Sequence, residues 1–147
     1  MATQSSGGGL CCPSAQPEME SARAFGLIDH AASPPTVQFL EELEPVTPEL
    51  VQLAAPLRPT EVFRFAAPCQ ESRCSHWDGA DCQLVERIVQ LLPVATLKLP
   101  PCLVRASCRW FAQAGRRACE RCPHVVTQDE HPSDEMRRAA AVPDLPG

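Results

Sequence analysis

The chain has 147 residues, a net charge of −5, nine cysteines, sixteen prolines and no tyrosine. Its first residues, MATQSSGGGL, have no basic start and no apolar run, which argues against a secretory signal. No stretch reaches the ~18 apolar residues that a membrane helix needs. We therefore expect a cytoplasmic protein without a membrane partner, in which thiols stay reduced and dense cysteines indicate metal binding or catalysis.

Composition also limits the fold. Sixteen prolines keep helices and strands short, because each proline fixes φ and removes a hydrogen-bond donor. A core poor in aromatics needs extra fastening, and the cysteines can supply it. We expect a mainly α fold: a small, irregular, metal-organised domain with short helices, little strand and flexible termini. The expected divisions are a flexible N-terminal lead at 1–18, a Cys-rich metal-binding domain at 19–128 and a disordered tail at 129–147.

The predicted elements of the first half are short. Residues 20–28, ESARAFGLI, suit a helix of two turns. A second helix is expected to begin at Thr47, a capping residue followed by Pro48 at the first helical position, and to end at Pro56. Residues 61–65, EVFRF, alternate apolar and charged side chains and predict a short strand.

Two longer helices are predicted in the second half. Residues 81–93, DCQLVERIVQLLP, place an apolar face on a helix that Asp81 can cap and Pro93 follows. Residues 102–114, CLVRASCRWFAQA, predict another helix that ends at Gly115, because glycine favours the backbone that closes a helix. After Thr127 the sequence becomes polar.

Cysteines dominate the second half as well. Seven of them fall within residues 69–122, in two runs separated by the predicted helix 81–93. A helix of about ten residues spans roughly 15 Å, after which the chain can return, so the two runs can meet at one place. With Cys12 there are eight thiols, enough for two four-thiolate sites, although one site with spare thiols suits the count equally. The candidate metal ligands are Cys12, Cys69, Cys74, Cys82, Cys102, Cys108, Cys119 and Cys122.

Positive charge surrounds the second run. Residues 105–121 carry five arginines and one acidic residue. Such cations lower thiol pKa values and offset the negative charge of an iron–sulfur cluster, and an aromatic ring can shield the cluster from water. Iron–sulfur clusters are usually held by four thiolates each. One or two clusters are therefore expected, with supporting contacts from Arg105, Arg109, Arg116, Arg121 and Trp110.

Two other interpretations stay open. Zinc sites are typically built from close pairs such as Cys69/Cys74 and Cys119/Cys122, with His76 or His124 as further ligands, but the wider spacings fit that pattern poorly. The third interpretation is thiol or disulfide chemistry without metal. Any single cysteine can also simply pack in the core.

Function follows from these alternatives. No phosphate-binding glycine loop, G-x-S-x-G or H-E-x-x-H motif is present, so the sequence indicates no enzyme class. The acidic balance disfavours nucleic acid. We expect electron transfer, redox sensing or support of a metalloenzyme, with a redox or metalloenzyme protein as partner. The alternatives are a zinc-stabilised interaction module whose arginine-rich helix docks an acidic partner, and a thiol-redox protein.

The stretches PTEVFRFAAPC, DCQLVERIVQLLP and LPPCLVRASCRWFAQAGRRACERCPHVVT resemble a family of small bacterial proteins from cyanobacteria and actinobacteria. The resemblance covers about residues 12–128. Members sometimes carry the label of nitrogen fixation protein, which implies an association with iron–sulfur or redox metabolism. The resemblance matches the family's cysteines to the eight candidate ligands and leaves Cys11 as an extra.

Overall fold

A four-stranded antiparallel sheet forms the centre of the protein. The structure is a computed structural model and describes residues 10–31, 35–125 and 134–140. The strands lie in the order β1-β4-β2-β3, and their bounds are β1 Cys11–Ala15, β2 Arg23–Asp29, β3 Thr36–Pro45 and β4 Phe63–Pro68. The expectation of a mainly α fold with little strand is therefore wrong, and the fold is mixed α/β.

Strand β2 replaces the helix expected at residues 20–28. It pairs with both β3 and β4, and its side chains Phe25 and Ile28 are buried. Gly26 is needed here, because a Cβ atom at this position would lie 2.5 Å from the Cγ1 atom of Val37 on β3. Glycine also disfavours a helix interior. Sheet pairing over long sequence distances therefore overrides the local helical pattern.

The two faces of β4 contact different parts of the molecule. Successive side chains of a strand point to opposite faces. Phe63 and Phe65 pack in a core with helix α1 (Pro48–Ala54), whereas Arg64 and Ala66 face the opposite way. The strand expected at 61–65 is confirmed from residue 63 onward, and the preceding residues form the short helix α2 (Pro59–Val62). Arg64 is buried although the sequence pattern suggested an outward charge.

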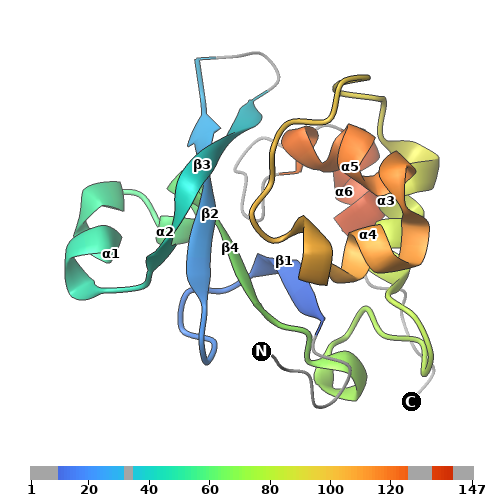
Figure 1. Ribbon diagram of the computed structural model, residues 1–147, viewed down its shortest axis with the longest axis horizontal. Helices are drawn as coiled ribbons and strands as arrows, with labels where there is room; N and C mark the ends of the chain where they lie inside the picture. The colour runs from blue at the N-terminus through green and yellow to red at the C-terminus, as the bar shows by residue number, and fades with distance from the viewer. Residues whose placement is uncertain (1–9, 32–34, 126–133, 141–147) are drawn as a thin grey trace.

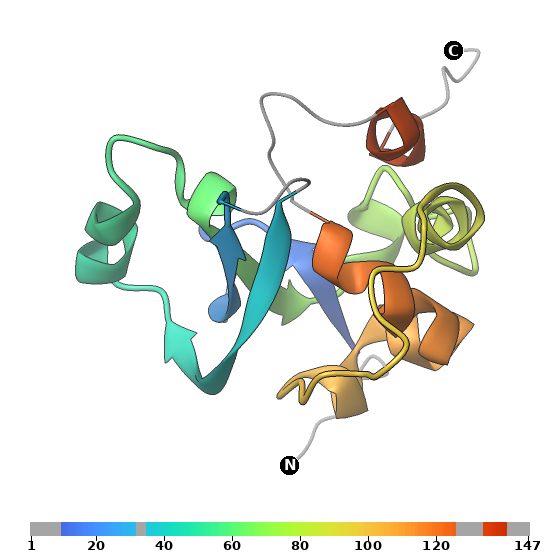
Figure 2. The same cartoon turned by 90° about the horizontal axis from the view of Figure 1, so that it is seen from above.

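The remaining helices lie on the side of the sheet away from α1 and α2, as both views show (Figures 1 and 2). They are α3 Gln83–Leu91, α4 Arg109–Ala114, α5 Arg116–Arg121 and α6 Asp134–Ala140, with 3-10 turns η3 Glu71–Arg73, η4 Arg105–Ser107 and η5 Cys122–His124. Their shared core contains Val85, Ile88, Trp110 and Val125. This helical half carries most of the cysteines.

Helix boundaries agree with the sequence at several points. Thr47 caps α1, because its Oγ1 accepts a hydrogen bond from the Leu50 N–H at 3.1 Å. Gly115, with φ 70°, ends α4 as expected, but the helix predicted from residue 102 begins only at Arg109, after the 3-10 turn η4. The cap expected from Asp81 is wrong, since α3 begins after Cys82. The Gln113 side chain holds Cys82 there, accepting from its N–H at 2.9 Å and donating to its carbonyl at 2.8 Å.

Parts of the expected lead and tail lie outside the described residues, namely 1–9, 129–133 and 141–147. The described part of the lead includes β1, which pairs with β4. The described part of the tail is α6, which packs on α3; Arg87 Nε donates to the Ala139 carbonyl at 2.8 Å. Within the described residues, no helix is long and apolar enough to cross a membrane.

Candidate metal centres

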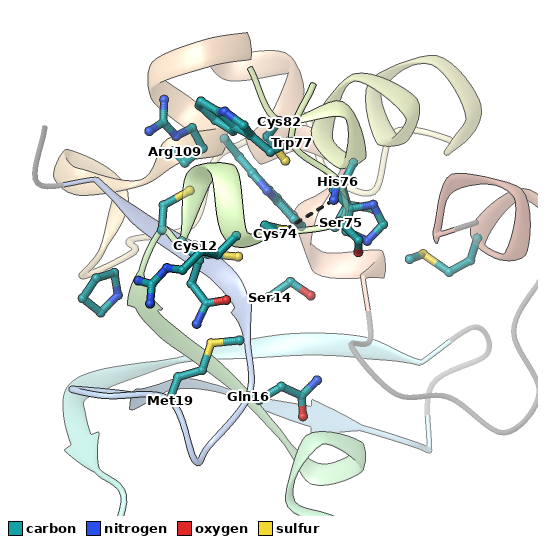
Figure 3. A pocket seen from close by; sticks show the side chains of 17 residues that line it. Cys12, Ser14, Gln16, Met19, Cys74, Ser75, His76, Trp77, Cys82 and Arg109 are labelled. Atoms are coloured by element: carbon teal, nitrogen blue, oxygen red, sulfur yellow. Dashed lines mark hydrogen bonds between the residues drawn. The ribbon is translucent and has the colours of Figure 1, made fainter. Parts of the chain in front are cut away.

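The structure sorts the nine cysteines into two groups. The first thiol group lines one cavity and consists of Cys12, Cys69, Cys74 and Cys82 (Figure 3). The second thiol group comprises Cys102, Cys108, Cys119 and Cys122, which line another cavity, and Cys11 beside them. The two cysteine runs therefore do not meet at one place. The consecutive residues Cys11 and Cys12 belong to different groups.

Strand pairing assembles the first thiol group. Cys12 on β1 pairs with Ala67 on β4, and the Cys69 N–H donates to the Leu10 carbonyl at 2.9 Å. The turn η3 then returns the chain, and Cys74 follows it. A bridge between Trp77 and Cys82 brings the start of α3 to the same cavity. Figure 3 shows Cys12, Cys74 and Cys82 arriving from three separate elements.

The first cavity is the larger of the two thiol-lined cavities. It has a volume of about 450 Å³. Four sulfurs bound to one zinc ion at about 2.3 Å lie only about 3.8 Å apart. Within the described parts of the chain, no three His, Cys, Asp or Glu side chains are arranged to hold one metal ion. An iron–sulfur cluster separates its thiolate ligands further, because each thiolate can bind a different iron.

Short helical turns assemble the second thiol group. Cys102 precedes η4, Cys108 caps α4, Cys119 lies within α5, and Cys122 opens η5. The backbone of Cys11 forms a parallel bridge with that of Cys108, which fixes the strand β1 against the start of α4. All four cavity-lining thiols of this group thus lie in the helical half, and only Cys11 comes from the sheet.

The second cavity is smaller. The centre of a water molecule can occupy about 20 Å³ of it. Aromatic side chains of Phe25, Phe39, Trp110 and Phe111 complete the wall.

Burial keeps many of these thiols protonated. It raises the pKa of Cys12 in the first group and of Cys108 in the second group to about 12. Burial also raises the pKa values of Cys11, Cys82, Cys102 and Cys119. Neighbouring thiols of the same group add to the rise for both Cys12 and Cys108. Deprotonation in these groups therefore requires a strong positive charge, which a bound metal supplies.

The predicted arginines divide between the two groups. Arg105 lines the second cavity and hydrogen-bonds Cys119, which opposes the rise in the pKa of that thiol. Arg109 lines the first cavity, where its Nη2 pairs with Glu71 Oε2 at 2.7 Å and its guanidinium lies 4.9 Å from the Trp77 ring centre.

The other two predicted arginines lie farther from the thiols. Arg116 is exposed and pairs with Glu120, although its charge also opposes the pKa rise of Cys119. Arg121 donates to the backbone carbonyls of Leu92 and Arg117 and lines neither cavity. Its role is to tie α5 to the end of α3.

Arg64 is a further residue beside the second thiol group, and the sequence pattern did not identify it. This side chain is fully buried and donates from Nη2 to the Cys122 Sγ at 3.3 Å. The only signal in the sequence was a single arginine between Phe63 and Phe65 in a predicted strand. A lone cation between two aromatic residues of a short strand can point into the core as well as outward, and only the position of the helical half decides between them.

Three buried N–H groups in residues that line the two cavities lack a hydrogen-bond acceptor among the described residues. The buried N–H groups of Arg105 Nε, Arg109 Nε and Trp110 Nε1 have no hydrogen-bond partner in the described residues. Arg109 and Trp110 line the first cavity, and Arg105 and Trp110 line the second. Buried N–H groups are normally satisfied, and N–H bonds to cluster sulfurs are a known means of tuning them. The residues present therefore fit an anionic iron–sulfur cluster.

The two cysteine pairs suggested by spacing do not share one zinc site. Cys69 and Cys74 lie in the first thiol group, whereas Cys119 and Cys122 lie in the second. His76 does line the first cavity, and its backbone N–H donates to Cys74 Sγ at 3.5 Å, but its ring Nδ1 bonds Arg87. All nine cysteines are free thiols, so the structure contains no disulfide framework.

No family model matches the chain, and neither a curated protein nor a solved structure matches it. The resemblance to the small bacterial family therefore stays a prediction.

Proposed function

We propose that this chain is an iron–sulfur protein that binds one cluster in each thiol group. The observation that carries the proposal is the sorting of eight cysteines into two sets of four, each lining its own cavity. Four thiolates are the usual ligand set of a cluster. The ligands would be Cys12, Cys69, Cys74 and Cys82 in the first site, and Cys102, Cys108, Cys119 and Cys122 in the second.

A cluster suits the two groups better than zinc does. A single ion needs several ligands around one point, and no such group of His, Cys, Asp or Glu side chains exists among the described residues. The unpaired N–H donors at the cavity walls favour a group with several sulfur acceptors. A zinc-stabilised interaction module, the alternative from the sequence, lacks these supports.

A thiol-redox role has less support. A reactive cysteine needs an accessible thiolate, which a lowered pKa provides. Burial instead raises the pKa of Cys12 and Cys108 to about 12. A thiolate at these positions would be rare at neutral pH unless a metal stabilised it.

Electron transfer is the role that two neighbouring clusters support best, with redox sensing or support of a metalloenzyme as related uses. Bound clusters would supply one-electron chemistry, while the protein would position them, shield them from water and set their potentials. The partner would be a redox protein or metalloenzyme. Nine free thiols fit a reducing compartment such as the cytoplasm.

Anaerobic purification followed by metal and sulfide analysis tests the proposal. Iron and acid-labile sulfide in equal amounts, with broad visible absorbance, would support it. A colourless protein with stoichiometric zinc would replace it with the interaction module. Folded protein that contains neither metal would leave only thiol chemistry.

A further inference from the structure

Arg64 places a full positive charge beside the second thiol group. It points from β4 toward the helical half, and its side chain is completely buried. The guanidinium carbon lies 5.2 Å from the ring centre of Phe25 and 5.6 Å from that of Trp110. The charge is therefore held between two aromatic faces, away from water.

The hydrogen-bond partners of Arg64 leave its charge uncompensated. Nε and Nη2 donate to the Pro13 carbonyl at 3.0 and 2.8 Å, and Nη1 donates to the carbonyls of Cys122 and Val125 at 3.0 and 2.8 Å. These acceptors are neutral. Across residues 10–31, 35–125 and 134–140, no carboxylate forms an ion pair with Arg64.

A buried charge without a counter-charge is costly, so such groups are normally paired. The Cys122 sulfur, 3.3 Å from Nη2, is the one partner of Arg64 that can carry negative charge. A negative charge on the second thiol group would compensate the guanidinium. An iron–sulfur cluster with four thiolates would supply that charge.

The first thiol group lacks such a cation. Arg73 and Arg109 line its cavity, but Arg73 is exposed to solvent, and Glu71 neutralises Arg109 through an ion pair at 2.7 Å. A positive charge and N–H bonds to sulfur raise the reduction potential of a cluster, because they stabilise the more negative reduced form. The charge of Arg64 acts through a poorly screening interior, so its effect on the second site is strong.

We propose that Arg64 is the buried counter-charge of the second centre and makes it the electron-accepting one of the pair. The inference depends on the proposed function. One electron would enter the first centre from a one-electron protein donor and pass to the oxidised second centre, without a change in bonds or protons. The donor returns to its oxidised form, and the second centre becomes reduced.

The two sites are close enough for this transfer. Cys12 of the first group follows Cys11 directly, and Cys11 lies beside Cys102 and Cys108 of the second; consecutive Cα atoms are only about 3.8 Å apart. The Trp110 ring lines both cavities. A short stretch of β1 and one shared aromatic wall therefore separate the two centres.

A redox titration of the anaerobically prepared full chain, followed by electron paramagnetic resonance, tests the inference. The wild type should show two reduction steps. In Arg64→Met the more positive step should move to lower potential by at least 59 mV, the equivalent of a tenfold loss in the electron-transfer equilibrium, while the other step stays in place. The matched control, Arg109→Gln, leaves Glu71 unpaired and should lower only the more negative step.

The outcomes separate the two proposals. A wild type without iron would overturn the proposed function. One reduction step, equal movement of both steps in Arg64→Met, or movement of the more negative step alone would overturn the role of Arg64 while leaving the iron–sulfur assignment in place. Should Arg64→Met fail to fold, Arg64→Lys decides: a smaller negative shift confined to the more positive step supports the inference, and any other pattern contradicts it.

Discussion

The two thiol groups are built from different structural elements and lie beside different charges. The first gathers its cysteines from a strand, a turn and a helix start around a cavity of about 450 Å³, and the less exposed of its two arginines, Arg109, is paired with a carboxylate. The second gathers them from adjacent helical turns around a small cavity, beside the buried and unpaired Arg64. The two proposed centres would therefore lie in distinct electrostatic environments.

Approximate interaction energies indicate which charges should affect the second centre most. Two unit charges about 5 Å apart interact with about 3 kcal/mol at an effective dielectric constant of about 20. An exposed ion pair contributes only about 0–1 kcal/mol. The buried Arg64 should therefore dominate the second centre, whereas Arg116, whose side chain is 55% exposed, should contribute little.

The largest expected effect is the loss of both clusters. Chelation under oxygen should lower the midpoint of thermal unfolding by about 10 °C, because metal that binds only the folded chain contributes folding free energy. Calorimetry of the loaded and the stripped protein measures it. If the two forms melted at the same temperature, the thiol groups would not be organised by metal.

Replacing Trp110, which lines both cavities, should disturb both thiol groups. Trp110 is buried and lines both cavities. Trp110→Ala should cost about 3–5 kcal/mol of unfolding free energy, because it leaves a cavity in the core, and should reduce the iron content of both sites. Urea unfolding and iron analysis check this. An iron loss confined to one site would show that the ring supports only that group.

Stability of the stripped protein should depend on alkaline pH. The folded pKa of Cys12 and of Cys108 is about 12, above the ordinary value of 9.0. The folded form therefore holds these protons more tightly, and its stability is complete below pH 9.0 and declines from there toward pH 12. Denaturant midpoints measured across that range follow the decline.

Matched variants divide this pH dependence between the groups. Cys12→Ala should remove the contribution of the first thiol group to the alkaline loss of stability, and Cys108→Ala should remove the contribution of the second. Each single variant should flatten the alkaline decline partly, and the double variant should flatten it further. If neither variant altered the slope, other groups would account for the decline.

The smallest effect is expected at the ninth cysteine. Cys11 lines neither cavity, and its sulfur lies 3.7 Å from the Ser107 hydroxyl. Cys11→Ser should keep the full iron content and change the unfolding free energy by about 1 kcal/mol or less. Loss of iron from the second site would make Cys11 one of its ligands.

Features that depend on a few neighbouring residues could be predicted from the sequence, whereas features that depend on distant segments could not. Thr47 with Pro48, and Gly115, marked helix ends correctly, because caps and glycine turns act within a few residues. The mainly α expectation failed because sheet pairing joins distant segments, such as residues 11–15 with 63–68. Strand preference depends on those partners more than on the segment itself.

The two thiol groups could likewise be predicted only in part. The cysteines could be singled out from their number and density, but their partition could not. Cys12 joins Cys69 only because β1 pairs with β4, and Cys74 parts from Cys119 only because the helices pack on one side of the sheet. Arg64 was missed for a related reason, since the direction of a strand side chain depends on which face is covered.

The most direct test of the central claim is the iron and sulfide content per chain in two matched variants. Cys74→Ser belongs to the first thiol group and Cys119→Ser to the second, and both thiols are half-buried. Each variant should lose about half of the iron and sulfide of the wild type, and the double variant should lose nearly all. Complete loss in either single variant, or unchanged content in both, would contradict two separate four-thiolate centres.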